Sequence, residues 1–300
     1  MQVYLATRCM KFTFRGSREG MTPSLLTFWG PERQCSVLVH FFEHGCWGSL
    51  VQTGGEEQSF TAQDQLFVLM QAAAYLTATR GQGSPEARSC YERAESLSHS
   101  IGRPLLMRAL IGQWRHSLNT GKLSGAMQVA ERLYSLAQKQ DDPMLMIWAY
   151  NALAVTHLYL GDFESARQYA THGVLIWRSG GGQSDPEDVD TPVVGCFCYK
   201  GGSEWHLGEI ASCHAMLDEA ISVAKELKDT HALAMALGWA ARQAFTERNP
   251  AEVDRFASEL IELSTRHNFV YWLASGTIWR AGRAALRVTP RKVFRGSSRE

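Results

Sequence analysis

The strongest chemical signature in the sequence is the stretch HFFEH at residues 40–44. His40, Glu43 and His44 have the His-x-x-Glu-His spacing with which inverted zincins bind zinc and place a general base beside it. On a helix, two histidines four residues apart would face the same metal ion. Gly45 follows directly and would end such a helix one residue after the second ligand. A zinc metallopeptidase is therefore kept as an alternative function, and the main prediction is a different one.

A second group of metal-ligand side chains contains Cys196, Cys198, His206, Cys213 and His214. Structural zinc sites use cysteine pairs separated by two to four residues. Cys196 and Cys198 are separated by one residue, so on a helix their thiols would point about 200° apart. Buried cysteines commonly act as small apolar side chains in helix packing. We therefore expect no metal site, no cofactor, no catalytic residues and no enzymatic activity in this chain.

Composition points to a globular protein in a reducing compartment. The chain has 300 residues, 45% of them hydrophobic, with 30 basic and 30 acidic residues. The zero net charge favours neither a nucleic-acid nor a membrane partner, and no apolar run is long enough to span a bilayer. Seven scattered cysteines do not form a disulfide framework. These features predict a cytoplasmic protein.

The elements that would position any site belong to a repeat. Small or modest residues recur at Ala87, Ala126, Ala166, Cys213 and Val253, in steps of 39, 40, 47 and 40 residues. The long step contains SGGGQSDPEDVDTP, residues 179–192, whose Gly, Pro and Asp content marks an inserted loop. Without that loop the period would be near 40 residues, which is typical of stacked helical hairpins.

Each period contains two segments with helical spacing of apolar residues, and the turn residues agree. Ser84, Asp142, Thr191 and Asn249 each precede a proline and can cap a helix. The predicted helices are 61–80 and 84–101, 104–120 and 123–140, 143–160 and 163–178, 192–207 and 210–228, 230–247 and 250–267, and one further helix from about 269. The predicted fold is an all-α, right-handed α-α superhelix of about five helical hairpins with an irregular N-terminal leader. The predicted domains are a leader at 1–59, a repeat domain at 60–282 and a basic, disordered tail at 283–300.

The stretch NALAVTHLYLGDFESARQYATHGV, residues 151–174, resembles a tetratricopeptide repeat. That motif has a large residue and a Leu-small pair in its first helix, which correspond here to Tyr150 and Leu153-Ala154. A Gly-Asp-aromatic turn follows at Gly161-Asp162-Phe163, and the small residues of the second helix are Ala166, Ala170 and Gly173. His157 replaces the usual aromatic residue of the first helix. The 40-residue period is also longer than the standard 34.

Longer phrases narrow the resemblance. EARSCYERAESL, LGDFESARQYA and ERNPAEVDRFASELIELS are similar to the C-terminal repeat region of bacterial regulatory proteins with a STAND/AAA-type ATPase core. Such proteins often carry an adenylate-cyclase domain or a DNA-binding domain of a transcriptional regulator. The resemblance covers about residues 66–282 and no catalytic part. It implies a protein-interaction module that acts as the sensor or coupling arm of a signalling protein.

The C-terminal segment departs from this resemblance. Residues 283–300 are rich in arginine, and a one-base shift of a GC-rich reading frame near residue 282 would produce such a tail. We therefore expect a frameshift, and a non-functional truncated fragment is the further alternative. The apolar segment 269–286 would then form an unprotected last helix, through which the chain could associate with itself.

The resemblance also implies where a ligand would bind. A tetratricopeptide solenoid binds a protein or peptide in the concave groove lined by the first helix of each hairpin. The groove positions carried over to this sequence give ten candidates: Arg108, Arg115, Asn119, Trp148, Asn151, Tyr159, Trp205, His206, Met235 and Arg242. Arg, Asn, Trp and Tyr side chains can bind a peptide backbone or carboxylate and bury apolar anchors.

The repeat pattern predicts that Ala166 allows the two helices of its hairpin to lie close together. We expect Ala166→Leu to overpack this contact and to lower the free energy of unfolding by about 1–3 kcal/mol. Urea unfolding would measure the change. A melting temperature equal to that of the unaltered chain would contradict the assignment of Ala166 to the helix contact.

Overall fold

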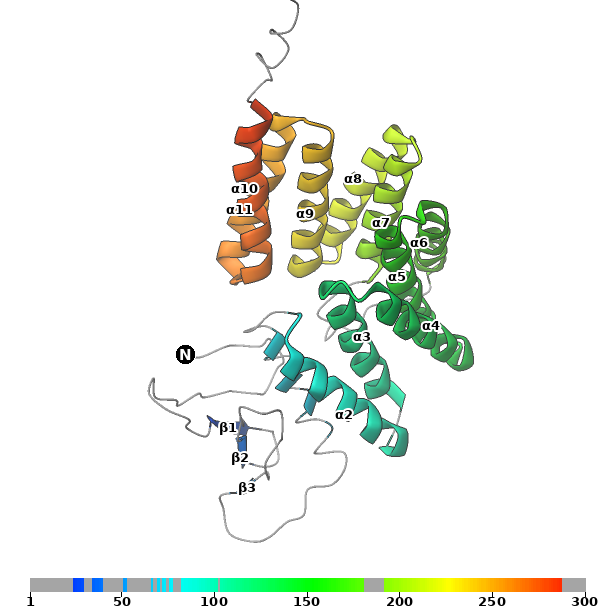
Figure 1. The fold of residues 1–300 in the computed structure, drawn as a ribbon, viewed down its shortest axis with the longest axis vertical. Coiled ribbons are helices and arrows are strands. Elements are labelled where there is room, and N and C mark those ends of the chain that lie inside the picture. Colours follow the sequence, from blue (N-terminus) through cyan, green and yellow to red (C-terminus); the bar gives the residue numbers. More distant parts are fainter. Residues whose placement is uncertain are drawn as a thin grey trace, which may run out of the picture. The chain divides into compact units, whose positions relative to one another are not determined.

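A computed structural model of the chain describes residues 24–29, 34–39, 51–52, separate residues between 66 and 77, and the ranges 82–101, 103–180 and 192–287 (Figure 1). The chain divides into two compact units, Met1–Gly112 and Gln113–Glu300. The repeat pattern predicts a single domain over residues 60–282.

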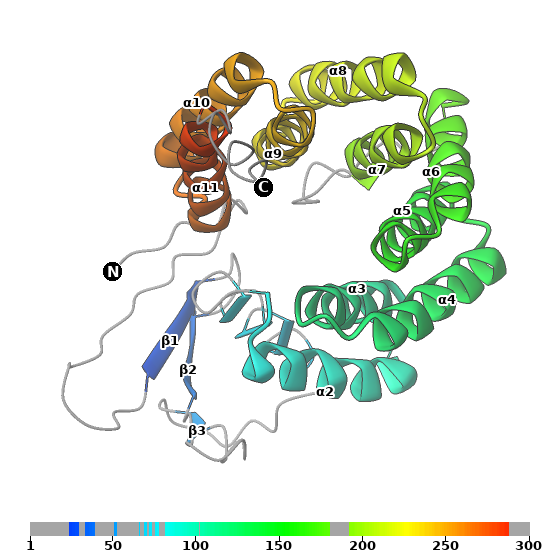
Figure 2. The same ribbon diagram turned by 45° about the horizontal axis from the view of Figure 1, so that its top comes forward.

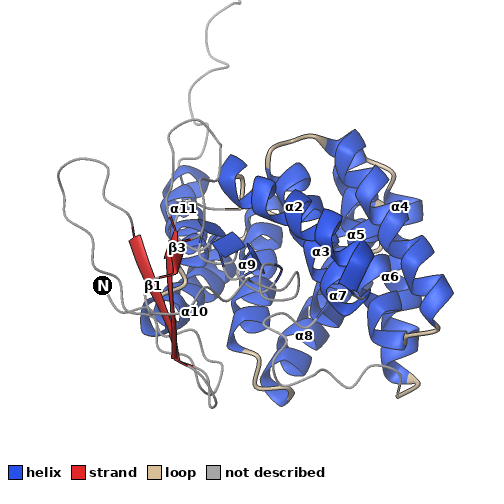
Figure 3. Cartoon of the chain, turned by 90° about the horizontal axis from the view of Figure 1, so that it is seen from below, coloured by secondary structure: helices blue, strands red, loops and turns tan. Residues whose placement is uncertain are grey.

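The first unit contains a small antiparallel sheet that was not predicted. Strands β1 (Ser24–Trp29), β2 (Gln34–Val39) and β3 (Val51–Gln52) pair in that order, with Ser24 opposite Val39 and Val37 opposite Gln52 (Figure 3). The sequences SLLTFW and QCSVLV are rich in aromatic and aliphatic residues that favour strands and lack helical periodicity. The predicted irregular leader thus contains paired strands within its described residues.

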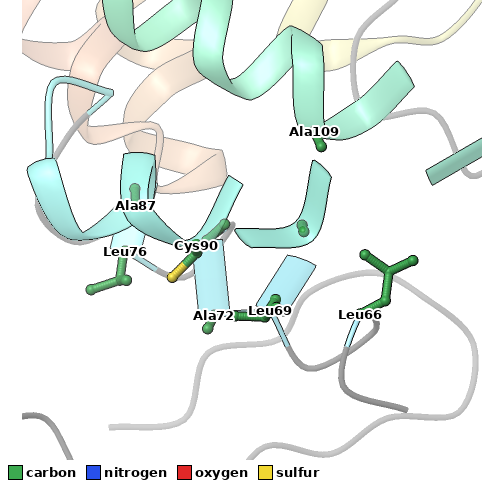
Figure 4. Packing of buried hydrophobic residues seen from close by; sticks show 9 residues of the cluster. Leu66, Leu69, Ala72, Leu76, Ala87, Cys90 and Ala109 are labelled. Carbon is green, nitrogen blue, oxygen red and sulfur yellow. The ribbon is translucent and has the colours of Figure 1, made fainter. Parts of the chain in front are cut away.

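Helices of the first unit surround an apolar cluster. Helix α2 (Pro85–Ile101) begins after Ser84, whose hydroxyl accepts a hydrogen bond from the Ala87 amide at 3.2 Å. Helix α3 (Arg103–Asn119) follows it. Leu66, Leu69, Ala72 and Leu76 pack with Ala87 and Cys90 of α2 and Ala109 of α3 (Figure 4).

Eight helices make up the described part of the second unit beyond α3. They are α4 (Leu123–Gln140), α5 (Pro143–Leu160), α6 (Phe163–Arg178), α7 (Pro192–His206), α8 (Ile210–Glu226), α9 (Thr230–Thr246), α10 (Pro250–His267) and α11 (Val270–Arg287). The predicted bounds of α4 to α10 agree with these to within two residues. Of the helices in the described residues, none has the length and apolarity to cross a lipid bilayer.

The predicted caps explain this agreement. The Asp142 carboxylate accepts from the Met144 and Leu145 amides at 2.9 and 3.2 Å, and Asn249 accepts from the Glu252 amide at 3.3 Å. Gly161 ends α5 with a φ of 83°, a conformation that glycine adopts without steric cost. Thr191, the remaining predicted cap, lies outside the described residues.

The second unit has an inner and an outer layer of helices. Helices α5, α7, α9 and α11 form the inner layer, in which each helix contacts the next (Figure 2). Helices α4, α6, α8 and α10 form the outer layer, and among the described residues the backbones of successive outer helices do not approach each other as closely. The layers therefore curve, because the inner helices lie closer together than the outer ones.

The C-terminal boundary of the repeat region was predicted too early. Helix α11 continues to Arg287, five residues past the predicted domain end at 282. Arg283, assigned from composition to a disordered tail, forms an ion pair with Asp254 of α10. The arginine content of the segment is therefore compatible with a packed helix. Residues 288–300 lie outside the described part of the chain.

Small residues set the distance between α6 and its neighbours. Ala166, Ala170 and Gly173 are buried on one face of α6, as predicted. A Cβ atom at Gly173 would lie 2.6 Å from the Cys196 Sγ of α7 and 3.6 Å from the Tyr150 Cβ of α5. Gly173 thus allows α6 to contact both inner helices at one point.

We predict that Gly173→Ala lowers the free energy of unfolding by about 1–3 kcal/mol through this clash, although alanine favours helices over glycine. Cys196→Ala removes the sulfur, so the double variant should be more stable than the sum of the two single changes by at least about 0.5 kcal/mol. Gly125→Ala is the control, because its nearest neighbour, Ser117 Oγ, would be 3.8 Å away. Urea unfolding of the four variants measures the coupling. Additive effects would show that Gly173 and Cys196 do not limit the helix contact.

Candidate functional site

The inner layer carries an aromatic residue at the same position of three successive helices. Tyr199 of α7, Trp239 of α9 and Trp279 of α11 are each forty residues apart, and we call them the aromatic row. The Tyr199 ring meets the Trp239 ring edge-on, with centroids 5.3 Å apart, and Trp279 packs against Phe245 at 5.5 Å. None of these three residues was among the predicted groove residues. The forty-residue spacing is the signal in the sequence that could have found the row.

Two arginines stack on tryptophan rings of the same layer. The Arg242 guanidinium lies 4.6 Å from the centre of the Trp239 ring, and the Arg115 guanidinium lies 5.3 Å from that of Trp148. Such stacking holds a planar guanidinium in one orientation. Within the described part of the chain, Arg242 has no carboxylate within ion-pair distance. Its hydrogen-bond donors are therefore available to a ligand.

Two helices of the inner layer carry exposed phenols. Tyr159 of α5 is 51% exposed and Tyr271 of α11 is 59% exposed. Desolvation raises the pKa of Tyr271 and raises that of Tyr199 well above the usual value, and the Tyr159 phenol adds to both increases. Tyr199 itself is buried, so the phenols that a ligand could reach in this group are those of Tyr159 and Tyr271.

His206 lies at the end of α7. Its ring stacks on Phe163, with centroids 4.0 Å apart and planes 4° from parallel, and it meets Trp205 edge-on at 5.0 Å. Desolvation lowers the pKa of His206, and the positive charge of Arg242 lowers it further. The imidazole is therefore predominantly neutral at pH 7 and can accept or donate a hydrogen bond beside Arg242.

Six predicted groove residues keep accessible side chains. Tyr159 and His206 are exposed, and the other four are half-buried: Arg115, Trp205, Met235 and Arg242. Two further candidates have other settings. Arg108 is exposed but belongs to the first unit, and Asn119, also exposed, donates its side-chain amide to the Arg115 carbonyl at 2.8 Å.

Asn151 and Trp148 were predicted to line the groove, but both side chains are buried. Asn151 is 4% exposed, and its side-chain amide donates to the Pro192 carbonyl at 2.9 Å. Trp148 is also buried, and its ring lies beneath the Arg115 guanidinium. Helix α5 contacts α4, α6 and α7, so little of its circumference remains for a ligand. The groove positions were taken from the 34-residue tetratricopeptide motif, which does not predict the contacts that α5 makes in this longer repeat.

The cysteine and histidine cluster does not assemble. Cys196, Cys198 and Cys213 are buried free thiols, and burial raises the pKa of Cys196 and of Cys213 to about 12. His214 instead lies 2.9 Å from the Glu247 carboxylate. No group of three metal-ligand side chains occurs in the described part of the chain. His40, Glu43 and His44 lie outside that part, so the zinc alternative stays a prediction.

The comparison with known proteins rests on structure. No protein-family model matches the sequence, and no curated protein matches it significantly. Apo RapI is similar with a TM-score of 0.52 and 8% identity, over 77% of this chain and 85% of that one. Aspartyl phosphate phosphatase F from Bacillus subtilis has a TM-score of 0.51 and 10% identity, over 77% and 62% of the two chains. A thermophilic TPR protein from Thermus thermophilus has a TM-score of 0.45 and 17% identity, over 75% and 98%.

The fold is a tetratricopeptide-like helical solenoid. This confirms the predicted α-α superhelix of helical hairpins. At these low identities the likeness concerns the fold alone. The function of the solenoid has to be inferred from its own side chains.

We predict that Asn151→Ala lowers the free energy of unfolding by about 1–3 kcal/mol, because it removes a buried hydrogen bond between α5 and the first residue of α7. Asn119→Ala is the matched control, since that amide is exposed, and we expect a change below about 0.5 kcal/mol. Urea unfolding of both variants measures the difference. Equal, small changes would mean that the Asn151 amide does not link α5 to α7.

Proposed function

We propose that this solenoid is a non-catalytic module that binds a protein or peptide on its inner layer. The observation that carries the proposal is the Arg242 guanidinium, which is stacked on Trp239 and has no carboxylate partner among the described residues. An arginine in this setting offers two parallel N–H donors to a carboxylate. The partner we expect is therefore a peptide segment with a carboxylate, from an acidic side chain or from a chain end.

The surroundings of Arg242 favour a peptide over a small anion. Trp239 supplies half-buried aromatic surface beside the cation, and the buried Tyr199 ring supports Trp239 edge-on. Tyr159 supplies an exposed phenol on α5, the inner helix beyond α7. Aromatic residues and arginines contribute most of the binding energy at protein interfaces. A peptide could place its carboxylate on Arg242 and an apolar side chain against the aromatic row.

The wider context comes from the sequence resemblance. The phrases that are similar to repeat regions of STAND/AAA-type ATPases suggest that the module is the sensor or coupling arm of a signalling or transcription-regulating protein. In that role, binding on the inner layer would be the input. Any ATPase or cyclase activity would belong to a different part of such a protein.

A second mode of association concerns the last helix. Val270, Tyr271 and Ile278 of α11 are exposed, in agreement with the expected apolar surface of this helix. Exposed apolar groups of this size often mark interaction sites. Self-association through α11 stays a prediction.

We predict that Arg242→Ala weakens peptide binding about 10- to 100-fold, which is the effect of losing a charge-assisted hydrogen-bonded pair. The full chain would be panned against a phage-displayed random-peptide library. Selected peptides would then be measured by isothermal titration calorimetry against the Arg242→Ala variant, a control variant and the unaltered chain. We expect these peptides to be enriched in acidic residues.

Arg255→Ala is the matched control. Arg255 also stacks on an aromatic ring, Phe256 at 3.8 Å, but it lies on the outer helix α10. Its removal should change the dissociation constant less than about two-fold. The proposal fails if the library yields no binders, if peptides with Asp→Asn and Glu→Gln changes bind equally well, or if both arginine variants lose the same affinity.

A further inference from the structure

A hollow of about 520 Å³ lies on α6 and α7, and none of the ten groove candidates lines it. Its walls include Arg167, Thr171, His172 and Leu175 of α6, together with Lys200 and Glu204 of α7. The volume is large enough for a small molecule or a single side chain. It is therefore a second candidate site, separate from the peptide surface proposed above.

The hollow follows from the spacing of the outer helices. Arg167, Thr171, Leu175 and Arg178 recur along one face of α6. This face is directed toward α8, because Arg167 pairs with Glu209 at 2.9 Å and Arg178 pairs with Glu219 at 2.5 Å. Since the backbones of α6 and α8 do not approach each other closely, the space between the two ion pairs lies open above α7.

Two charged side chains of α7 are directed into this space and are incompletely satisfied. Glu204 is 2% exposed, and one of its carboxylate oxygens pairs with the Lys200 ammonium. The other oxygen, Oε2, has no hydrogen-bond partner in the described part of the chain. Glu204 is likewise the only partner of the Lys200 ammonium there, which leaves N–H donors of Lys200 unused. Among the described residues, two side chains that line the hollow thus have an unused acceptor and unused donors side by side.

The solenoid does not need this charged pair. Lys200 and Glu204 lie eight and four residues before the turn residue Gly208. The corresponding residues of α9, counted back from Arg248, are Ala240 and Ala244, both buried. Those of α5, counted back from Gly161, are Leu153 and His157. A buried ion pair is seldom more stable than apolar residues in the same place. A charged pair at positions where a neighbouring inner helix has buried alanines is expected at functional sites.

We propose that the α6–α7 hollow binds the amide group of a ligand. The amide N–H would donate to Glu204 Oε2, and the amide carbonyl would accept from the Lys200 ammonium. The adjacent methyl groups of Thr171 and Leu175 would contact the aliphatic part of the ligand. An amide group carries both the donor that Glu204 Oε2 lacks and the acceptor that the Lys200 ammonium lacks. The N–H and the carbonyl of an amide are close together, as are these two side chains.

Charged groups fit the pocket less well. A carboxylate would accept from Lys200 but would face the Glu204 carboxylate and leave Oε2 without a donor. An ammonium group would donate to Oε2 but would face the Lys200 ammonium. A neutral group with both functions satisfies both side chains without adding charge.

Three fragments of similar size test this chemistry on the full chain: propionamide, propionate and propylammonium. The methyl resonances of Thr171 and Leu175 report binding by NMR during titration at pH 7. We expect saturable shifts with propionamide, with a dissociation constant on the order of 10 mM for so small a ligand. The other two fragments should bind at least five-fold more weakly.

Variants separate binding from folding. Lys200→Ala combined with Glu204→Ala gives α7 the alanine pair of α9, so the melting temperature should stay the same or rise while the propionamide response is lost. Glu204→Gln keeps the side-chain shape and should weaken the response at least five-fold, which preserves the test if the double variant folds poorly. Arg178→Ala is the control, because Arg178 joins α6 to α8 without lining the hollow.

The proposal is overturned if propionate or propylammonium binds as tightly as propionamide, if no fragment gives a saturable shift, or if the response persists in the Glu204 variants. A second comparison identifies the source of the amide. Tighter binding of free L-glutamine than of a short peptide with an internal glutamine points to a metabolite, and the reverse order points to a side chain of a partner protein. Each order supports amide recognition.

Discussion

The close approach of helices at small side chains is the constraint on which the second unit depends. At Gly173, α6 lies so near α7 that a single methyl group would collide with the Cys196 sulfur. A similar approach occurs at Gly238 of α9, where a Cβ atom would lie 2.9 Å from the Trp272 ring. The first contact joins the outer layer to the inner one, and the second joins two inner helices. Because the inner helices lie closer together than the outer ones, the layers curve. The curvature produces both surfaces to which we assign ligands.

The two surfaces differ in their chemistry for a geometric reason. On the inner layer, successive helices are close enough for side chains to stack, so Arg242 is held on Trp239 and Tyr199 meets the same ring. Between the outer helices the separation is larger, and the space above α7 contains Lys200 and Glu204. The inner layer therefore suits an extended partner with a carboxylate, and the outer hollow suits a small neutral group.

Much of the fold could be predicted because its signals are local. The Asp142 and Asn249 caps, the turn at Gly161 and the helical spacing of apolar residues act within a few positions of each other, so the helix limits from 123 to 267 agreed with the structure to within two residues. The site could be predicted only in part. Arg242 and Tyr159 have the expected exposure, but Asn151 is enclosed by helices that are distant in sequence.

The α-α superhelix and the limits of the helices between residues 123 and 267 followed from the sequence alone, since these depend on short-range periodicity and capping. Only the tertiary structure decided which side chains remain available. It buried Asn151, brought the Tyr199 and Trp239 rings together, and left Glu204 Oε2 without a donor among the described residues. Exposure and pairing depend on contacts between helices about forty residues apart in sequence, and such contacts are set by packing distances that no local pattern records.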